Sequence, residues 1–469
     1  MPRDLHGYAT DIPYLRDFKP MLAPAWLDHV ALVAGVEPPP RKSGFAWCEL
    51  GCGQGVTANM LAATHPQGAF HAIDGMPVHI DHARRLAAEA ALPNISLHCV
   101  DFTAALDLEL PSFDYIVAHG VYSWVNGTSQ RALRRFFDRR LKPGGLVYVS
   151  YNAMPGWARD LPFQHLSRAL AHGFSGDSAG RFSAAIGIIR RLVAAEVPAL
   201  VPSFIVNEIE QRPEDYPPAY LVHEFIPDAF HPLYVTEIRT EMKSIELAPV
   251  GSATLIENTD LLALRENARA MLSAIADDDL RELVRDFYRD QRFRCDVFAR
   301  GNPRLSSEQR CEALLAGTFA LARPAAAIRY SAATPGGFHP YNNPTARAIV
   351  GALADGPRPL GELASASAPR QDLATNILVL CAIGDVMPVE PGRALVEPLN
   401  RAIFRRLDGA EEIRWLTLPC GTAIEVDLSL MRRLRDGEKI DKDAFPGWPG
   451  FLASHGILEF TTETPRAQR

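Results

Sequence analysis

Residues 45–151 alternate between short apolar runs and segments with helical spacing. The apolar runs are FAWCEL, GAFHAIDG, ISLHCVDF, FDYIVAHG and GGLVYVSY. Residues 56–64 and 76–91 follow the first two runs and carry apolar side chains at helical intervals. Five short strands separated by helices predict an α/β fold with a parallel, doubly wound, Rossmann-like sheet.

The pattern changes outside this region. Residues before Phe45 predict a helical cap, and residues 161–200 read as largely helical. We therefore expect an N-terminal lid over residues 1–44, a ligand-binding core over 45–200, a mixed and helical middle domain over 215–330 and a winged-helix-like domain over 341–469.

The last of these predictions rests on three short helical patterns at residues 345–354, 360–367 and 372–383, which lead into an extended segment. Residues 341–400 hold four Arg against six acidic residues, a net charge of −2. A winged helix that reads DNA is usually basic. We therefore interpret this module as one that packs against the core or gates the substrate.

Composition narrows the function classes. The chain has 469 residues, 47% hydrophobic and 22% charged, with a net charge of −7, so a packed protein is expected and nucleic acid is not an expected partner. No apolar stretch is long enough to insert into a membrane, and the first residues lack a signal-peptide pattern, which favours the cytoplasm. Cys48 with Cys52, and His79 with His82, lack further ligands at metal-site spacing, so no metal is expected. We interpret the two histidines as surface residues.

The strongest local signal is ELGCGQG, which follows a predicted strand and opens a helix. Such a glycine-rich turn lets a ligand approach the backbone closely. Glu49 precedes the first glycine, and its carboxylate would repel a pyrophosphate but tolerate a positively charged ligand. The loop residues predicted to bind the ligand are Glu49, Gly51, Cys52, Gly53, Gln54 and Gly55.

An acidic residue also ends each of the next two strands. Asp74 lies 19 residues after Gly55 and is placed to accept hydrogen bonds from ribose hydroxyls, with Gly75 and Met76 beside it. Asp101 can accept from an adenine amino group, and Phe102 can stack on the base. Acids at all three strand ends favour a cationic adenosyl ligand, S-adenosylmethionine (SAM).

The fourth and fifth strands end in segments rich in aromatic residues. These ends should face the methyl group of SAM, because ligands bind outside the carboxyl ends of such sheets. The candidate residues are His119, Gly120, Tyr122 and Trp124 after the fourth strand, and Tyr151 and Trp157 after the fifth. Ordinary core packing remains the alternative for these aromatic side chains. The segment lacks the (D/N)PP(Y/F/W) pattern of enzymes that methylate amino groups of DNA bases.

ELGCGQG, DFTAAL, FDYIVAHGVYSWV, LKPGGLVYVSYNAMPGW and AYLVHEF resemble bacterial class I SAM-dependent methyltransferases that carry a methyltransferase regulatory domain. That group includes protein-lysine methyltransferases. The resemblance implies an antiparallel last strand in the core and an N-terminal segment, with Tyr14, that closes over the cofactor. It also implies that Glu49, Gly51, Gly53 and Gly55 line the methionine portion of SAM, Asp74 the ribose and Asp101 the adenine.

The sequence therefore predicts a SAM-dependent methyltransferase that acts on lysine side chains of a protein. A methyltransferase of small metabolites and a catalytically silent scaffold are the alternatives. His119 and Tyr122 are the candidate proton acceptors, and Tyr151 and Trp157 complete the predicted catalytic set. His223 and Glu224 lack the second histidine of a zinc protease motif and are interpreted as structural residues of the middle domain.

Overall fold

The computed structural model describes residues 10–41, 44–200, 204–212, 216–365, 368–390, 395–409 and 412–457. Among those residues, no helix combines the length and the apolar composition needed to cross a membrane.

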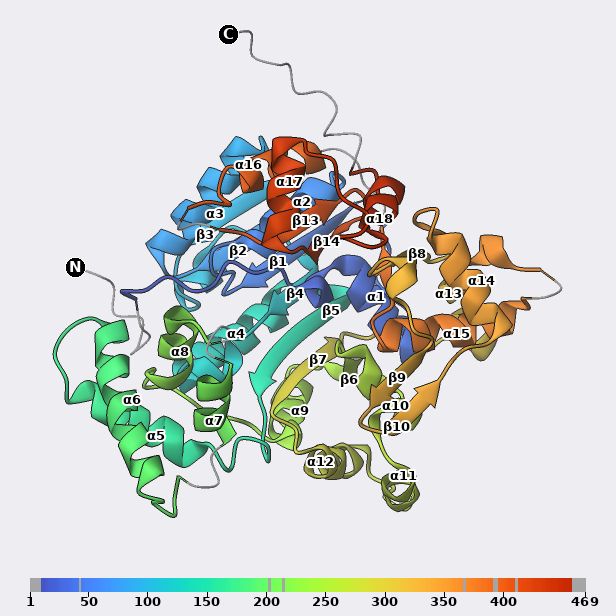
Figure 1. Ribbon diagram of the computed structural model, residues 1–469. Helices are drawn as coiled ribbons and strands as arrows, with labels where there is room; N and C mark the ends of the chain where they lie inside the picture. The colour runs from blue at the N-terminus through green and yellow to red at the C-terminus, as the bar shows by residue number, and fades with distance from the viewer. Residues whose placement is uncertain are drawn as a thin grey trace, which may run out of the picture.

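A seven-stranded sheet forms the centre of the protein (Figure 1). Its strands, in spatial order, are β3 (Ile95–Cys99), β2 (Gly68–Asp74), β1 (Phe45–Leu50), β4 (Phe113–Ala118), β5 (Leu141–Asn152), β7 (Phe293–Ala299) and β6 (Ala248–Ser252). The first five are parallel, and β7 is antiparallel to both β5 and β6. The predicted α/β fold with its doubly wound sheet is confirmed, and the antiparallel strand agrees with the resemblance.

Helices cover both faces of this sheet, which explains why its central strands β1 and β4 are buried along their whole length. Consecutive side chains of a strand point to opposite faces. Trp47 packs in the hydrophobic cluster that holds Leu61 of α2 (Val56–Thr64), whereas Cys48 packs in the cluster that holds Phe136 of α4 (Gly127–Arg140). Helix α3 (Pro77–Glu89) lies beside α2 and contacts β2 and β3. All six residues of β1 are buried as a result.

A long helical segment separates β5 from the last two strands of the sheet. It contains α5 (Leu161–His172), α6 (Ser178–Ala194), α7 (Phe204–Gln211), α8 (Pro218–Phe225) and α9 (Val235–Lys243). Phe163 of α5, Phe182 of α6 and Phe225 of α8 form one buried cluster. Figure 1 shows α5 to α8 grouped beyond the carboxyl end of the sheet. The sheet is then completed by strands from residues 248–299, so it extends beyond the stretch 45–200 predicted for the core.

Further helices connect the strands of the middle region. They are α10 (Asp260–Ala263), α11 (Glu266–Leu272) and α12 (Asp278–Arg289). Before the sheet, residues 10–19 run without regular structure, followed by a short 3-10 turn (Pro20–Leu22) and α1 (Pro24–Val33). We call residues 10–19 the N-terminal strap.

The C-terminal residues form two packed groups. The first contains α13 (Ser307–Ala316), α14 (Pro344–Leu353) and α15 (Arg370–Ala382) around strands β8 (Thr318–Leu321), β11 (Arg358–Pro359) and β12 (Val386–Val389), with the hairpin β9 (Ser331–Thr334) and β10 (Gly337–Pro340) beside it. In place of the helix expected at residues 360–367, a 3-10 turn covers Leu360–Leu363, and residues 366–367 lie outside the described ranges.

The second group packs back on the core. It contains α16 (Val396–Phe404), β13 (Trp415–Leu418), β14 (Thr422–Glu425), α17 (Leu428–Asp436) and α18 (Trp448–Ser454). Helix α16 contacts α2 and α3, and Arg406 forms an ion pair with Glu89 at 2.6 Å. Strands β13 and β14 also contact α2, so this group covers α2 and α3 on their outer side.

Candidate active site

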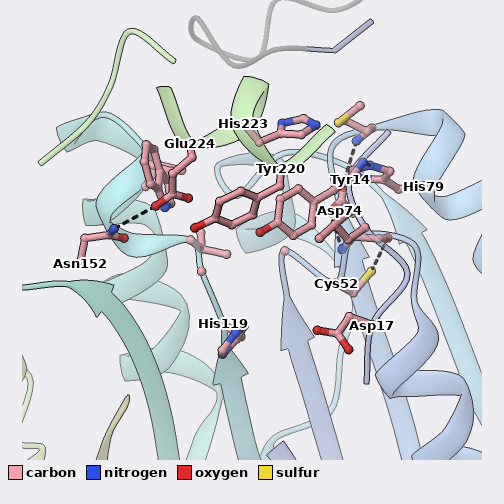
Figure 2. A pocket seen from close by; sticks show the side chains of 18 of the residues that line it. Tyr14, Asp17, Cys52, Asp74, His79, His119, Asn152, Tyr220, His223 and Glu224 are labelled. Carbon is pink, nitrogen blue, oxygen red and sulfur yellow. Dashed lines mark hydrogen bonds and ion pairs between the residues drawn. The ribbon is translucent and has the colours of Figure 1, made fainter. Parts of the chain in front are cut away.

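A cavity of about 510 Å³ lies at the carboxyl ends of the parallel strands. Most of the residues predicted to form the site line it: Tyr14, Glu49, Gly51, Cys52, Gly53, Asp74, Gly75, Met76, Asp101, Phe102, His119, Gly120, Trp124 and Trp157. The N-terminal strap and α8 close it from the opposite side (Figure 2). One cavity therefore unites the ends of β1, β2, β4 and β5 with segments distant in the sequence.

The glycine loop after β1 has a left-handed backbone conformation at Gly51, Gly53 and Gly55. Gly51 has φ +77°, and a Cβ atom there would lie 2.3 Å from Cγ2 of Val121. The Gly53 amide donates a hydrogen bond to Asp74 Oδ2 at 2.9 Å, which fixes the loop against the end of β2. Backbone and carboxylate thus form one rigid rim of the cavity.

Glu49 is the last-but-one residue of β1 and is only 4% exposed. Its Oε2 atom is buried without a hydrogen-bond partner among the described residues. Burial, together with the nearby charge of Asp74, raises the pKa of Glu49 well above its usual value. An unpaired buried carboxyl group costs free energy, and a cationic ligand group would relieve that cost.

Asp74 joins the loop, α3 and the strap. Its Oδ1 accepts from the Met76 amide at 2.8 Å and lies 3.1 Å from Nδ1 of His79. The other ring nitrogen of His79 accepts a hydrogen bond from the Tyr14 amide at 3.0 Å. The strap is held further by Gln54, whose side-chain amide donates to the Tyr14 carbonyl.

The expectation that His79 and His82 are surface residues is wrong. Both are buried, at 2% and 1% exposure, because α3 turns them toward the glycine loop. His82 Nδ1 lies 2.8 Å from the Gln54 carbonyl. The two rings support the cofactor loop from behind.

The adenine side of the cavity contains Asp101 and Phe102. Oδ1 of Asp101 accepts hydrogen bonds from the amides of Thr103 and Ala104, both at 2.9 Å. These bonds fix the carboxylate, and its second oxygen takes no part in them. The Phe102 ring lies close to Gly51, at the edge of the loop.

Together these residues fit SAM. Glu49 provides a buried carboxyl group with an unpaired oxygen, the glycines allow close backbone approach, and Asp74 and Asp101 present fixed carboxylates for the hydroxyl and amino groups of an adenosine.

His119 lies in the cavity wall after β4. Its Nδ1 is 2.8 Å from the Tyr148 hydroxyl, and its ring packs edge-on to Phe293 with centroids 5.8 Å apart. Burial and the charge of Lys19 lower the pKa of His119 to about 3. The imidazole is therefore neutral over the physiological pH range and a weak base.

The cavity wall does not include four of the predicted site residues, which are Tyr122, Tyr151, Gln54 and Gly55. The Tyr122 hydroxyl donates to Glu241 at 2.5 Å, and the Tyr151 hydroxyl donates to Asp296 at 2.7 Å. Both tyrosines are fully buried in the core between the sheet and its outer helices. Their hydroxyls are committed to these carboxylates, so the structure does not bring them to the predicted site.

Several residues that line the cavity were absent from the sequence prediction. Tyr220, His223 and Glu224 come from α8, Asn152 ends β5, and Arg292 precedes β7. His223 and Glu224 were interpreted as structural residues of the middle domain, and the structure corrects this by placing both in the cavity wall (Figure 2). The sequence signal that marks His223 and Glu224 is the motif AYLVHEF, which also contributes to the resemblance.

Comparison with known proteins agrees with this geometry. A family model described as a methyltransferase domain matches residues 48–147, and one described as a predicted methyltransferase regulatory domain matches residues 217–300. The uncharacterized protein sll1526 of Synechocystis sp. is 30% identical over 432 residues, which cover 90% of this chain and 85% of that protein. The chain belongs to the methyltransferases that carry a methyltransferase regulatory domain.

Solved structures show the same fold. The structure of PKMT2 from Rickettsia typhi in complex with AdoHcy (S-adenosylhomocysteine) has a TM-score of 0.66 and 18% identity, and the match covers 97% of this chain and 93% of that one. A second structure of PKMT2 from the same organism has a TM-score of 0.65 and 19% identity over 90% of this chain and 88% of that one. The protein is a SAM-dependent methyltransferase, with SAM as its cofactor.

The region that matches the regulatory-domain model forms part of the central sheet and of the cavity wall. Residues 217–300 include α8, which contributes to the cavity wall, and both β6 and β7 of the central sheet. Arg292 and Phe293, from the same region, also line the cavity. The site therefore requires both matched regions.

Proposed function

We propose that this enzyme transfers a methyl group from SAM to the side-chain nitrogen of lysine in a protein substrate. The observation that supports this most directly is the contrast between the two sides of the cavity. Fixed carboxylates and the glycine loop form one side, and the rings of Trp124, Trp157 and Tyr220, which pack in one cluster, form the other. An aromatic wall attracts an ammonium group by about 0.5–2 kcal/mol per ring.

We assign the SAM contacts to the residues that the structure groups at the polar side. Glu49 faces the positively charged methionine portion, the amides of the loop at Gly51 and Gly53 lie against it, Asp74 accepts from the ribose and Asp101 with Phe102 holds the adenine. The unpaired Oε2 of Glu49 supports this orientation, since a cation there would gain a buried partner. The strap, through Tyr14, covers the cofactor.

When bound, SAM supplies an electrophilic methyl group on a sulfonium. The protein aligns the acceptor with it and excludes water, which together account for most of the acceleration in such displacements. A lysine must be neutral to react, and its deprotonation at pH 7 costs roughly 4–5 kcal/mol from an ordinary pKa of about 10.4. The like charge of the bound sulfonium lowers that cost, because it repels the ammonium form.

The name PKMT2 of the structural relative and the motifs of the resemblance support lysine as the acceptor. A small metabolite with an amino group is the second candidate, because the cavity alone fits its ammonium group equally well.

The test is incubation of the enzyme with methyl-labelled SAM and an extract of the source cells, followed by separation of macromolecules from small molecules. We expect label in bands that a protease removes. Label confined to the small-molecule fraction would contradict the proposal and support the metabolite alternative.

A further inference from the structure

Glu224 is a buried acid in the aromatic side of the cavity that lacks a cationic partner. It is the last-but-one residue of α8, and its carboxylate Oε1 accepts a hydrogen bond from Asn152 Nδ2 at 3.3 Å (Figure 2). Among the described residues, no Lys or Arg nitrogen lies within ion-pair distance of it. The cavity thus contains a second acidic group, away from Asp74 (Figure 2).

The groups that surround Glu224 do not neutralise it. Tyr220 of α8 and Tyr14 of the strap bring neutral hydroxyls, because burial raises the pKa of both. Arg292 is the cation whose charge acts on Glu224. Its guanidinium, however, donates hydrogen bonds to Asp160 and to the Gly156 carbonyl and lies 5.0 Å from the centroid of the Trp157 ring. The Glu224 carboxylate therefore faces the cavity without a bound cation from the described residues.

Asn152 holds Glu224 in a defined place. Two hydrogen bonds fix the backbone of Asn152: its N–H donates to Ser123 Oγ at 2.8 Å, and its carbonyl accepts from the Leu233 amide at 2.9 Å. A carboxylate fixed in this way between aromatic rings matches a primary ammonium, which offers three N–H donors.

We propose that Glu224 binds the ammonium group of the acceptor and receives its proton before methyl transfer. The identity of the acceptor as an amine rests on the function proposed above. The ammonium gives one proton to the carboxylate, and the neutral amine forms the new N–C bond while the S–C bond breaks and its electron pair stays on sulfur. The methylated product leaves as an ammonium, and Glu224 returns its proton to solvent.

Glu224 suits this role better than His119. Burial raises the pKa of Glu224 to about 7, partly offset by the bond from Asn152 and the charge of Arg292, so its ionisation falls in the working pH range. The pKa of His119, about 3, lies far below it.

The first test measures binding without catalysis. The enzyme saturated with S-adenosylhomocysteine is titrated by calorimetry with n-butylammonium, which reproduces the lysine side chain, and with n-butanol. We expect Glu224→Gln to weaken n-butylammonium binding at least tenfold and to leave n-butanol unchanged. In the wild type, binding should weaken about tenfold from pH 8 to pH 6, since the ionised fraction of a group with pKa about 7 falls by that factor.

Three comparisons make this test decisive. Glu312→Gln, the same change on the exposed side of α13, should match the wild type. Glu224→Asp should recover part of the binding, and all variants should bind S-adenosylhomocysteine within twofold of the wild type. Equal n-butylammonium binding by Glu224→Gln and the wild type, or no binding by the wild type, would overturn the proposal.

The second test separates this inference from the proposed function. The initial rate of label transfer from SAM is measured from pH 6 to 9 for each variant, whichever fraction of the extract carries the label. We expect Glu224→Gln to lose 10²–10⁴-fold and to lose the rise in rate near pH 7. If the label enters small amines and Glu224→Gln still loses the rise in rate near pH 7, protein methylation is contradicted but the role of Glu224 is not. If Glu224→Gln keeps the pH profile of the wild type, the role of Glu224 is contradicted.

Discussion

The backbone amide of Tyr14 donates a hydrogen bond to Nε2 of His79 at 3.0 Å. Because Nε2 accepts this bond, the ring proton lies on Nδ1, which faces Asp74 Oδ1 at 3.1 Å. One buried imidazole therefore links the strap to the carboxylate that we assign to the ribose.

His79→Ala should weaken binding of S-adenosylhomocysteine by about tenfold. The change removes two hydrogen bonds worth about 1 kcal/mol each, and hydrogen bonds to water replace part of that lost free energy. His79→Asn retains a donor near Asp74, but its shorter side chain places no acceptor at the position of Nε2, so it should show an intermediate loss. Calorimetry measures both. Unchanged affinity in His79→Ala would mean that the strap closes independently of α3.

Much of the polar side of the site was predictable from the sequence. The period of the apolar runs located β1 to β5, and the loop ELGCGQG with Asp74 and Asp101 followed from local turn chemistry and the geometry of parallel sheets. These features depend on residues close together in the chain.

The aromatic side of the cavity was less predictable from the sequence. Glu224 and Asn152 are 72 residues apart, and Glu224 meets Asn152 only because α8 packs on α5 and α6 beyond the sheet. The pairing of β7 with β5 likewise joins segments that local patterns do not connect. A single 3-10 turn, Tyr122–Trp124, sends Trp124 to the cavity and Tyr122 to the core, a choice that tertiary packing makes.

Gly51→Ala should destabilise the protein by roughly 2–4 kcal/mol, because a left-handed backbone and a contact with Val121 act together. Gly144→Ala is a matched control, since Gly144 has φ +78° but no atom within 4 Å of the added Cβ. It should cost about 1 kcal/mol. Denaturant unfolding distinguishes the two, and equal losses would show that the loop can move away from Val121.

Tyr122→Phe should leave the rate of methyl transfer within twofold of the wild type and cost about 1–2 kcal/mol of stability. The lost hydroxyl donates to Glu241 and accepts from Arg134 at 2.6 Å, while the ion pair between those two residues remains at 3.0 Å. Initial rates with labelled SAM and unfolding curves check this. A tenfold loss of rate in a fully folded variant would return Tyr122 to the catalytic set.

Docking of the C-terminal region on α3 should depend on pH. Hydrogen bonds and charge from Arg406 and Arg405 lower the pKa of Glu89 to about 2. A lowered pKa in the folded state gives stability that is present above the unfolded value, near 4.5, and is lost as the pH falls toward 2. Glu89→Gln should therefore be less stable than the wild type at pH 7, with a difference that shrinks below pH 4.5. Because Glu89 is 35% exposed, we expect this difference to be about 1 kcal/mol.

The identity of the residue that receives the methyl group distinguishes lysine methylation from every other protein methylation. Protein labelled by the enzyme and methyl-labelled SAM is hydrolysed to amino acids, and the labelled products are separated by chromatography against methylated standards. We expect the label to migrate with methylated lysines, and we expect Glu49→Ala to abolish it by removing a SAM contact. Label on methylated arginine, histidine or a carboxyl ester would contradict lysine methylation.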